Sequence, residues 1–361
     1  MTKLRDICRF QSGGTPSRGT PAYFNGNVPW ITTVALNGDV IDGNQAIEWI
    51  TDEAIAKSAA KIVPPHSVMV GTRVGIGKVA INSVPMSTSQ DIISLIGIDE
   101  NKWDKKFICH LITANKEHLT SQARGATIKG IKIEAIADLV LPEISLKEQA
   151  RISEVIGKVD ALMHMHQQMA MNLEQLIKSR FIELFGDPVI NPKGFPCYTV
   201  GEVIDFQGGS QPDKKYFEYE ASPDNIRLIQ IRDYKSDKYI TYIPKTMAKR
   251  FCTADDIMIG RYGPPIFQIL KGIEGSFNVA LMKATPKIGN KEFVRQFLKQ
   301  DCLLEYLEGL SKRTAGQDGI QMDKLKAYPF PYPPIELQEQ FAAFVEQTDK
   351  SKLCGKMEVA A

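Results

Sequence analysis

The sequence predicts two copies of one mixed α/β (α+β) domain, separated by long helices that form an antiparallel coiled-coil-like pair. Three observations support this prediction. The chain has 361 residues, which is enough for two or three domains. Short sequence matches recur in the same order about 190 residues apart. Between the copies, residues 146–185 contain no proline and have a helical period of apolar residues.

The composition excludes some classes of protein and leaves others open. Apolar residues make up 43% of the chain and charged residues 24%, which is typical of a folded protein with a real core. The net charge is only +2, which excludes a polycation of the histone type. A local basic groove remains possible, because residues 1–145 and 189–334 carry net charges of +1 and +4, against −1 for 146–188 and −2 for 335–361.

The cysteines and the first residues indicate the compartment. Six cysteines are scattered along the chain without a Cys-x-x-Cys pair, so a disulfide scaffold and a zinc site are both disfavoured. The N-terminus lacks the apolar segment of a signal peptide, and no apolar run reaches the length of a membrane span. We expect a cytoplasmic chain with reduced thiols and no contact with a membrane.

The internal repeat rests on five matched segments. The spacing of the matches drifts only from 196 to about 190 residues, and their order is preserved. Such a period is too long for a solenoid and fits two large domains of one design. The matched pairs are 7–16 with 203–212, 27–31 with 225–229, 67–71 with 256–260, 130–133 with 319–322, and 144–149 with 334–340.

Each copy combines strand and helix signals. Residues 68–70 and 257–259 are rich in β-formers and end at a glycine, whereas 107–119 and 293–310 are typical of helices. Gly13-Gly14, Pro64-Pro65 and the Gly-Pro-Pro at 263–265 mark loops. These signals give the domain class but not the order of strands.

Residues 146–185 predict a single helix of about 60 Å. Gly186-Asp187-Pro188 ends it, because glycine suits the position after a helix and proline cannot continue one. Its apolar stripe predicts pairing with a second helix over about 337–353, although the same stripe would also fit an ordinary core. The predicted pairing or docking positions are Ile152, Val159, Leu162, His166, Met169, Leu173, Leu176, Phe341, Phe344 and Val345.

No catalytic or metal-binding constellation is found. Residues 71–78 come nearest to a phosphate-binding loop, but a strand–turn–strand hairpin is the better interpretation because the first glycine and the final Ser/Thr are missing. His164 and His166 are two residues apart and so lie on different helix faces. Asp255 and Asp256 are adjacent and would point to opposite sides of a strand. The pattern favours a binding protein with no catalytic residue, metal or cofactor of its own.

Polar and basic residues near glycine-rich turns are the candidates for DNA contact. Arg, Lys and Gln read base edges, and Ser, Thr and Lys hold phosphates, although each residue alone could equally be a solvated surface group. They fall in matching places of the two copies, which fits two surfaces that differ in detail. The candidates are Ser12, Thr15, Ser17, Arg18, Arg73, Lys78, Arg124, Thr127 and Lys129 in the first copy, and Gln207, Gln211, Lys214, Arg227, Gln230, Arg232, Arg261, Tyr262, Lys312, Arg313 and Gln317 in the second.

Several segments carry a family resemblance over nearly the whole chain. They are Leu-Arg-Asp-Ile at 4–7, Ser-Gly-Gly-Thr-Pro-Ser at 12–17, the run 23–31, the run 141–149 into the long helix, and Phe-Ile-Glu-Leu-Phe-Gly-Asp-Pro at 181–188. With these segments the sequence resembles the specificity subunits of type I restriction–modification systems.

This resemblance implies a division of labour along the chain. It implies target recognition domains at 1–145 and 189–334, a central spacer helix at 146–188 and a C-terminal helix at 335–361. Each domain would read one half of a split double-stranded DNA target. The helices would dock two modification (adenine methyltransferase) subunits, and restriction (motor-nuclease) subunits would join that core. S-adenosylmethionine, ATP and Mg are expected only on those partners.

One departure and two alternatives complete the sequence-based expectations. The family's second helical region is usually about as long as its first, whereas Gly355 and the small residues after it predict that the second helix stops or frays near Leu353. It would then cover only about half of the 40-residue helix. The alternatives are an enzyme with an unrecognised active site, which would bind S-adenosylmethionine, and a helical scaffold that binds only protein.

Overall fold

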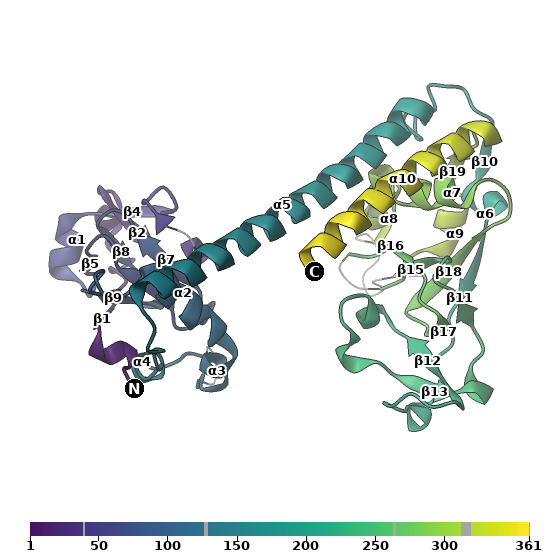
Figure 1. Ribbon diagram of the computed structural model, residues 1–361. Helices are drawn as coiled ribbons and strands as arrows, with labels where there is room; N and C mark the ends of the chain where they lie inside the picture. The colour runs from purple at the N-terminus through teal and green to yellow at the C-terminus, as the bar shows by residue number, and fades with distance from the viewer. Residues whose placement is uncertain (39, 126–128, 263–264, 312–318, 361) are drawn as a thin grey trace. The chain divides into compact units, whose positions relative to one another are not determined.

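The computed structural model describes residues 1–38, 40–125, 129–262, 265–311 and 319–360 (Figure 1). The chain forms two compact units, Met1–Leu162 and Met163–Ala361, called unit 1 and unit 2 below. The division falls inside helix α5 (Leu146–Phe185), which is the predicted long helix. Gly186 ends this helix with φ of +76°, and its N–H donates to the carbonyl of Ile182 at 2.8 Å.

Unit 1 contains two sheets, and every residue of β6 and β7 is buried, so these strands lie at its centre. The five-stranded sheet has the order β1 (Arg9–Ser12), β9 (Ile92–Ile96), β6 (Val68–Gly71), β7 (Val79–Asn82), β3 (Val40–Ile41), and the four-stranded sheet has the order β4 (Glu48–Ile50), β2 (Val28–Ile31), β8 (Met86–Thr88), β5 (Ile62–Val63). The helices are α1 (Asp52–Lys57), α2 (Lys105–Ala114), α3 (Lys116–Ser121) and α4 (Ile133–Ala137), with 3-10 turns η1 (Leu4–Asp6), η2 (Pro21–Phe24) and η3 (Thr33–Ala35).

Unit 2 contains two four-stranded sheets and a short strand pair. The sheets have the orders β11 (Ile204–Gly208), β18 (Leu281–Pro286), β15 (Ile257–Gly260), β16 (Gln268–Lys271), and β13 (Tyr242–Pro244), β12 (Asn225–Ile229), β17 (Gly275–Phe277), β14 (Phe251–Cys252), and β10 (Cys197–Thr199) pairs with β19 (Pro329–Pro331). The helices are α6 (Val200–Val203), α7 (Lys291–Leu298), α8 (Asp301–Ser311), α9 (Met322–Lys326) and α10 (Ile335–Ala360), with 3-10 turns η4 (Lys214–Tyr216), η5 (Ile231–Tyr234), η6 (Asp237–Tyr239) and η7 (Lys245–Met247).

The two units repeat one topology, which confirms the predicted duplication. Four neighbouring strands of the first sheet, β1-β9-β6-β7, correspond in order to β11-β18-β15-β16. The second sheets match throughout, including one parallel pair in the same place: Trp30 lies opposite Ser87 and Leu228 opposite Ser276. Most of the other pairings are antiparallel, so each unit is of the α+β kind.

Each unit has a core of its own. In unit 1, α2 packs on β7, and its N-terminus is capped by Asp104, whose carboxylate accepts from the Phe107 N–H at 2.6 Å. Its buried face carries Ile108 and Ile112. In unit 2 the core is richer in aromatic rings, with Phe293, Phe297 and Phe330 all about 1% exposed or less. These cores hold the sheets rigidly, so the loops at their ends are well placed to present side chains.

The described side chains of helix α10 pack against the end of α5. Phe341 and Val345 share the core of unit 2 with Ile177, Phe181 and Phe185, and Phe344 packs against the edge of that core. The Phe185 and Phe341 rings lie 5.3 Å apart, and Figure 1 shows the two helices antiparallel at this end of α5. An antiparallel helix pair is therefore present, as the sequence predicted.

The predicted stripe nearer the middle of α5 stays a prediction. Val159, Leu162, Met169 and Leu176 expose 46%, 49%, 40% and 48% of their surface, and Ile152, His166 and Leu173 are half-buried. The heptad pattern is real, but the sequence could not show which part of it a partner helix covers. These positions stay predicted docking positions for another subunit.

The predicted end of the second helix near Leu353 was wrong. Helix α10 continues through Gly355 to Ala360. Glycine inside a helix lowers helix stability by only about 1 kcal/mol relative to alanine, and no proline lies between Gly355 and Ala360 to end the helix. In the described part of the chain, no helix combines the length and apolar character needed to cross a bilayer.

The beginning and end of each repeated domain lie side by side. In unit 1 the Leu4 N–H donates to the Leu139 carbonyl at 3.0 Å, and the Leu141 N–H donates to the Thr2 carbonyl at 2.8 Å. In unit 2, β10 pairs with β19, and the Val200 N–H donates to the Tyr328 carbonyl at 2.9 Å. The same closure therefore occurs twice.

Candidate nucleic-acid interface

A basic hollow of about 800 Å³ lies on unit 1 and brings together Arg73 and Arg124, two of the residues predicted to contact DNA. Its lining includes Arg73, Arg124 and Lys132, with Glu134 as an acidic member. Two segments far apart in sequence build it, because the Ile131 N–H donates to the Thr72 carbonyl at 2.8 Å. Arg124 and Gly130 also exchange backbone hydrogen bonds of 2.9 and 3.0 Å. A concave surface rich in Arg and Lys suits a phosphate backbone or base edges.

Arg73 and Lys78 belong to the hairpin that joins β6 to β7. The Gly71 N–H donates to the Lys78 carbonyl at 2.8 Å, and the Gly77 N–H donates to the Gly71 carbonyl at 3.0 Å. These amides serve the turn, so the hairpin interpretation holds and a phosphate-binding loop is absent from residues 71–78. The side chains of Arg73 and Lys78 are exposed. Exposed Lys129 lies close by in sequence, and the predicted Thr127 lies outside the described residues.

The Gly-Gly turn of unit 1 has a structural task. The Gly13 N–H donates to the Ile92 carbonyl at 3.0 Å, and the Gly14 N–H donates to the Thr88 carbonyl at 2.9 Å. A Cβ at Gly14 would lie 2.1 Å from the Ala59 carbonyl oxygen, so only glycine fits. The backbone amides expected to face phosphate are therefore used inside the domain. Of the side chains, Ser12 and Ser17 are exposed and Thr15 is half-buried.

Arg18 is engaged by its own domain. Its guanidinium forms a two-point ion pair with Glu48, in which Nη2 donates to Oε2 at 2.8 Å. The same group lies over the rings of Phe24 and Trp30, at 4.4 and 5.4 Å from their centroids. Hydrogen bonding from Arg18 lowers the pKa of the Glu48 carboxyl. These contacts give Arg18 a structural role, and its contact with DNA stays a prediction.

The corresponding turn of unit 2 repeats this arrangement. The Gly209 N–H donates to the Leu281 carbonyl at 3.1 Å, and a Cβ there would lie 1.9 Å from the Asn278 carbonyl oxygen. Gln207 is half-buried on β11, whereas Gln211 and Lys214 are exposed on the loop that follows. The same glycine turn therefore connects the two sheets in each unit, and only the side chains that follow the turn are exposed to a ligand.

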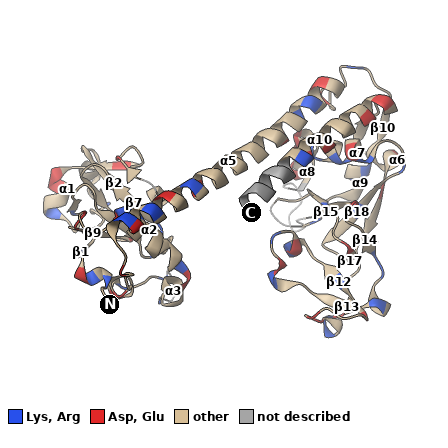
Figure 2. Cartoon of the chain, in the orientation of Figure 1, with Lys and Arg blue, Asp and Glu red and all other residues tan. Residues whose placement is uncertain are grey.

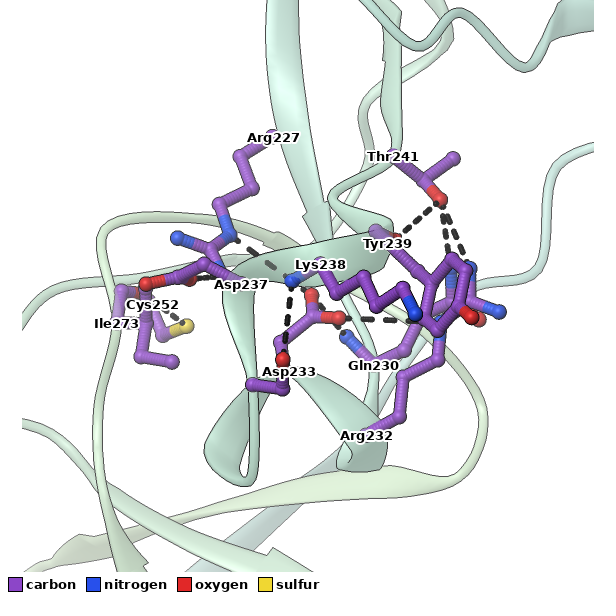
Figure 3. Close-up of polar contacts among 11 residues, drawn as sticks. Arg227, Gln230, Arg232, Asp233, Asp237, Lys238, Tyr239, Thr241, Cys252 and Ile273 are labelled. Carbon is purple, nitrogen blue, oxygen red and sulfur yellow. Dashed lines mark hydrogen bonds and ion pairs between the residues drawn. The ribbon is translucent and has the colours of Figure 1, made fainter. Parts of the chain in front are cut away.

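A polar cluster after β12 gathers three more candidates (Figure 3). Gln230 Nε2 and Arg232 Nη2 both donate to the Thr241 hydroxyl, at 3.1 and 3.0 Å. Arg227 Nη2 donates to Asp237 Oδ1 at 2.9 Å. These bonds tie the three side chains to Asp237 and Thr241, which lie between η5 and β13.

Asp233 is the buried centre of that cluster. Its side chain is 1% exposed, and its oxygens lie 3.8 Å from Arg227 Nε and 3.9 Å from Arg232 Nε. Its Oδ2 accepts from the Gln230 N–H at 3.1 Å. Burial raises the pKa of the Asp233 carboxyl, and the two guanidinium groups offset only part of this effect.

The cluster opens onto a hollow of about 500 Å³ with aromatic walls. Tyr219, Tyr239 and Tyr242 line it together with Arg232 and Lys238. Tyr219 and Tyr239 are 73% and 58% exposed, and the Tyr239 ring centroid lies 6.0 Å from the Arg232 guanidinium and 5.4 Å from the Lys238 amino group. Sequence reasoning missed these residues. The available signal was the alternation of Tyr with Lys and Arg over 214–242, a pattern typical of surfaces that stack or contact bases.

Arg261 and Tyr262 follow the end of β15. The Arg261 N–H donates to the Ala280 carbonyl at 2.9 Å, and the guanidinium lies 5.4 Å from the Tyr262 ring centroid. Tyr262 is 48% exposed and forms an isolated bridge with Gly319. The predicted Lys312, Arg313 and Gln317 lie outside the described residues.

Basic and acidic residues are interspersed along the chain of each unit (Figure 2). Within the described residues, no group of three or more His, Cys, Asp or Glu side chains is arranged to hold a metal ion.

The family model for the type I restriction modification DNA specificity domain matches residues 1–175 and 192–355. The chain belongs to this family. Its two matched stretches follow the two repeats seen in the fold. Among curated proteins, the chain is 25% identical over 273 residues to the type I restriction enzyme MjaIX specificity subunit of Methanocaldococcus jannaschii, with 66% of this chain and 63% of that protein covered.

A second curated relative and one solved structure extend this picture. The EcoR124I/EcoR124II specificity subunit of Escherichia coli is 30% identical over 166 residues, which cover 44% of this chain and 40% of that protein. The match to these two relatives thus spans 63% and 40% of their own lengths. The S subunit of a type I restriction-modification system from M. genitalium shares the fold, with a TM-score of 0.56, 16% identity, and coverage of 99% of this chain and 91% of that one.

Proposed function

We propose that this chain is the DNA-specificity subunit of a type I restriction–modification complex, and that each repeated domain reads one half of a split, asymmetric double-stranded DNA target. The observation that carries the proposal is that the two units share one sheet topology but carry different side chains at equivalent turns and strand ends. A duplicated frame supplies two equivalent reading surfaces. Their diverged residues make the two half-sites different in sequence.

Two hollows support this assignment. The one on unit 1 is lined by Arg73, Arg124 and Lys132, and the one on unit 2 by Arg232, Lys238 and tyrosines. Arginine and lysine are the side chains that contact phosphates and guanine, and tyrosine rings contact bases through their faces. In this proposal residues 1–145 and 189–334 are the target recognition domains, 146–188 is the spacer helix and 335–361 the second helix.

The exposed apolar side chains of α5 support docking of partner subunits. Val159, Leu162 and Met169 lie on one face of the helix and are 40–49% exposed, and exposed apolar side chains grouped in this way mark protein interfaces. Pseudo-two-fold repetition provides equivalent sites for two modification subunits, and restriction subunits would join that core. The chain itself would be non-catalytic and cytoplasmic. S-adenosylmethionine, ATP and Mg²⁺ would act on the partner subunits.

Methylation mapping tests the proposal directly. The chain is expressed with its modification subunit in a host without DNA methylation, and the genome is sequenced for modified bases. The expected result is one split, asymmetric motif with methyladenine on both strands, and no motif with the modification subunit alone. A folded chain that gives no motif with an active partner would contradict the proposal. Binding of S-adenosylmethionine to the purified chain would instead favour an enzyme.

A further inference from the structure

One pair of exposed side chains occupies the same backbone position in the two units. Strand β6 ends at Gly71 and β15 ends at Gly260, which are 189 residues apart in sequence. The same spacing relates α4 to α9. Two residues after the strand end stands Arg73 in unit 1, and at the equivalent place in unit 2 stands Tyr262.

The backbone around this position is the same in both units. The residue that precedes Arg73 or Tyr262 makes the same backbone hydrogen bond in each unit. The Thr72 N–H donates to the Asp91 carbonyl at 2.8 Å, and the Arg261 N–H donates to the Ala280 carbonyl at 2.9 Å. Asp91 and Ala280 are again 189 residues apart. The frame is therefore fixed, and the side chain it carries has changed.

Each of the two side chains lies against a glycine. A Cβ at Gly130 would lie 2.8 Å from Arg73 Cγ, and a Cβ at Gly319 would lie 3.2 Å from Tyr262 Cε1. These glycines are also 189 residues apart and precede α4 and α9. Any other residue at either glycine would displace the side chain above it. Both units therefore keep a flat backbone surface that supports one outward-facing side chain.

The neighbouring position has changed together with the supported side chain. In unit 1, Asp91 Oδ1 lies 3.5 Å from Arg73 Nη1, which orients the guanidinium without occupying all of its donors. In unit 2 the equivalent residue is Ala280, and the supported residue carries no charge. The acidic neighbour is present where the cation is present and missing where the cation is missing.

Exposure at both positions leaves room for a ligand. The Arg73 side chain is 47% exposed, and Tyr262 is 48% exposed. Arg73 also lines the basic hollow of unit 1. A guanidinium donates to the O6 and N7 acceptors of guanine, whereas an apolar ring suits the methyl group of thymine.

We propose that positions 73 and 262 are equivalent base-reading positions, with Arg73 reading a guanine in one half-site and Tyr262 contacting a thymine in the other. Asp91 acts as a positioning residue for Arg73. This inference rests on the proposed function and adds which residues determine specificity.

The test uses the complex of the full chain with its modification subunit. We compare wild type with Arg73→Ala, Arg73→Lys, Tyr262→Ala and Tyr262→Phe by mapping the methylated motif and by measuring methylation rates on a duplex that carries the wild-type target. Arg73→Ala should relax the motif at one guanine in one half-site and slow methylation of that duplex about tenfold to hundredfold. Tyr262→Ala should relax one position in the other half-site.

Two further variants sharpen the test. Arg5→Ala is the matched control, since Arg5 is also 47% exposed and ion-paired in unit 1, to Asp138, and it should leave the motif and the rate unchanged. The double substitution of Arg73→Tyr with Asp91→Ala copies the unit 2 pair into unit 1. It should change the preferred base at the affected position from guanine to thymine. Asp91→Ala alone should weaken the preference for guanine, and Asp91→Glu should restore it.

The possible failures are distinguishable. If the wild-type complex yields no split motif, the proposed function itself fails. If the wild-type motif is split but Arg73→Ala leaves every position intact, or slows all sites equally without relaxing any, the base-reading role of Arg73 is overturned. Relaxation of the same half-site by the Arg73 and Tyr262 variants would overturn the equivalence of the two positions.

Discussion

The ring of Phe181 on α5 stacks on the ring of Phe293 on α7, with centroids 5.6 Å apart and planes 9° apart. Phe341 of α10 meets Phe181 edge-on at the same centroid distance, 5.6 Å. These three rings are 1% exposed or less and fasten the end of the long helix to the core of unit 2. Aromatic burial of this kind is the largest single contribution that one side chain makes to such a core.

Phe181→Ala should therefore destabilise unit 2 by about 3–5 kcal/mol, because it removes a buried ring and leaves a cavity. The matched control is Ile182→Ala on the next residue, which is 45% exposed and should change stability by less than about 0.5 kcal/mol. Urea denaturation followed by circular dichroism measures both. Equal effects of the two variants would show that α5 is not held by this ring cluster.

The ion pair between Arg18 and Glu48 should respond to acid in a defined direction. Because Arg18 lowers the pKa of Glu48, the stabilisation is present above the unfolded pKa of about 4.3 and is lost as pH falls through the folded value. Both side chains are partly exposed, so Glu48→Gln should cost at most about 1 kcal/mol at neutral pH. Urea unfolding across this pH range should show the difference from wild type disappearing in acid. Glu53→Gln, at an exposed helix pair with Lys57, is the control and should show a smaller difference.

Asp233 should show the opposite pH dependence. Burial raises its pKa, so the folded state binds the proton more tightly than the unfolded chain does. As pH falls from about 7 toward about 4, wild type should gain stability relative to Asp233→Asn, which cannot titrate. Unfolding free energies of the two proteins over this range measure the effect. If the difference instead shrinks on acidification, Arg227 and Arg232 outweigh the burial of the carboxylate.

Cys109 of unit 1 and Cys197 of unit 2 should differ sharply in reactivity. Burial raises the pKa of Cys109 to about 12, so it carries almost no thiolate at neutral pH, whereas Cys197 is exposed. Iodoacetamide at neutral pH should label Cys197 well before Cys109, as followed by peptide mass spectrometry. Labelling in denaturant is the control and should remove the difference. Rapid labelling of Cys109 in the folded chain would contradict its place on the buried face of α2.

Four residues inserted between Asn172 and Leu173 should change the spacer of the DNA target and leave both half-sites unchanged. The insertion point precedes Ile177, Phe181 and Phe185, so it leaves the buried anchor of α5 in unit 2 intact. Lengthening a helix by four residues adds about 6 Å along its axis. Methylation mapping of the inserted chain with its modification subunit reads the spacer directly. A change in half-site sequence would contradict the role of α5 as a spacer.

The repeat and the long helix were predictable because they depend on local signals. The matched segments preserve order, and residues 146–185 lack proline and end at a glycine with a following proline. The pairing of β2 with β8 was not predictable, since these strands are more than 50 residues apart and their parallel register depends on the complete sheet. The extent of α10 was misjudged because Gly355 is tolerated inside a helix.

The candidate surfaces were predictable only as lists of residue types. The sequence could not show that Arg18 meets Glu48, or that the amides of Gly13 and Gly14 are used by the sheets, because those partners lie 30 or more residues away. It also missed Tyr219 and Tyr239, whose neighbourhood forms only when η6 folds beside β13. The glycine surfaces at Gly130 and Gly319 likewise became visible only when distant segments were brought together.

The paired ends of each domain have a genetic consequence. The two ends of the repeated domain of unit 1 meet at the contact of Leu4 with Leu139, and the two ends of the repeated domain of unit 2 meet where β10 pairs with β19. A gene segment that encodes one domain therefore begins and finishes at a single structural seam. Homologous recombination at that seam can exchange the segment as a cassette while the helices remain untouched. Under the proposed function, such an exchange would change one half-site of the DNA target in one event, without remodelling the rest of the subunit.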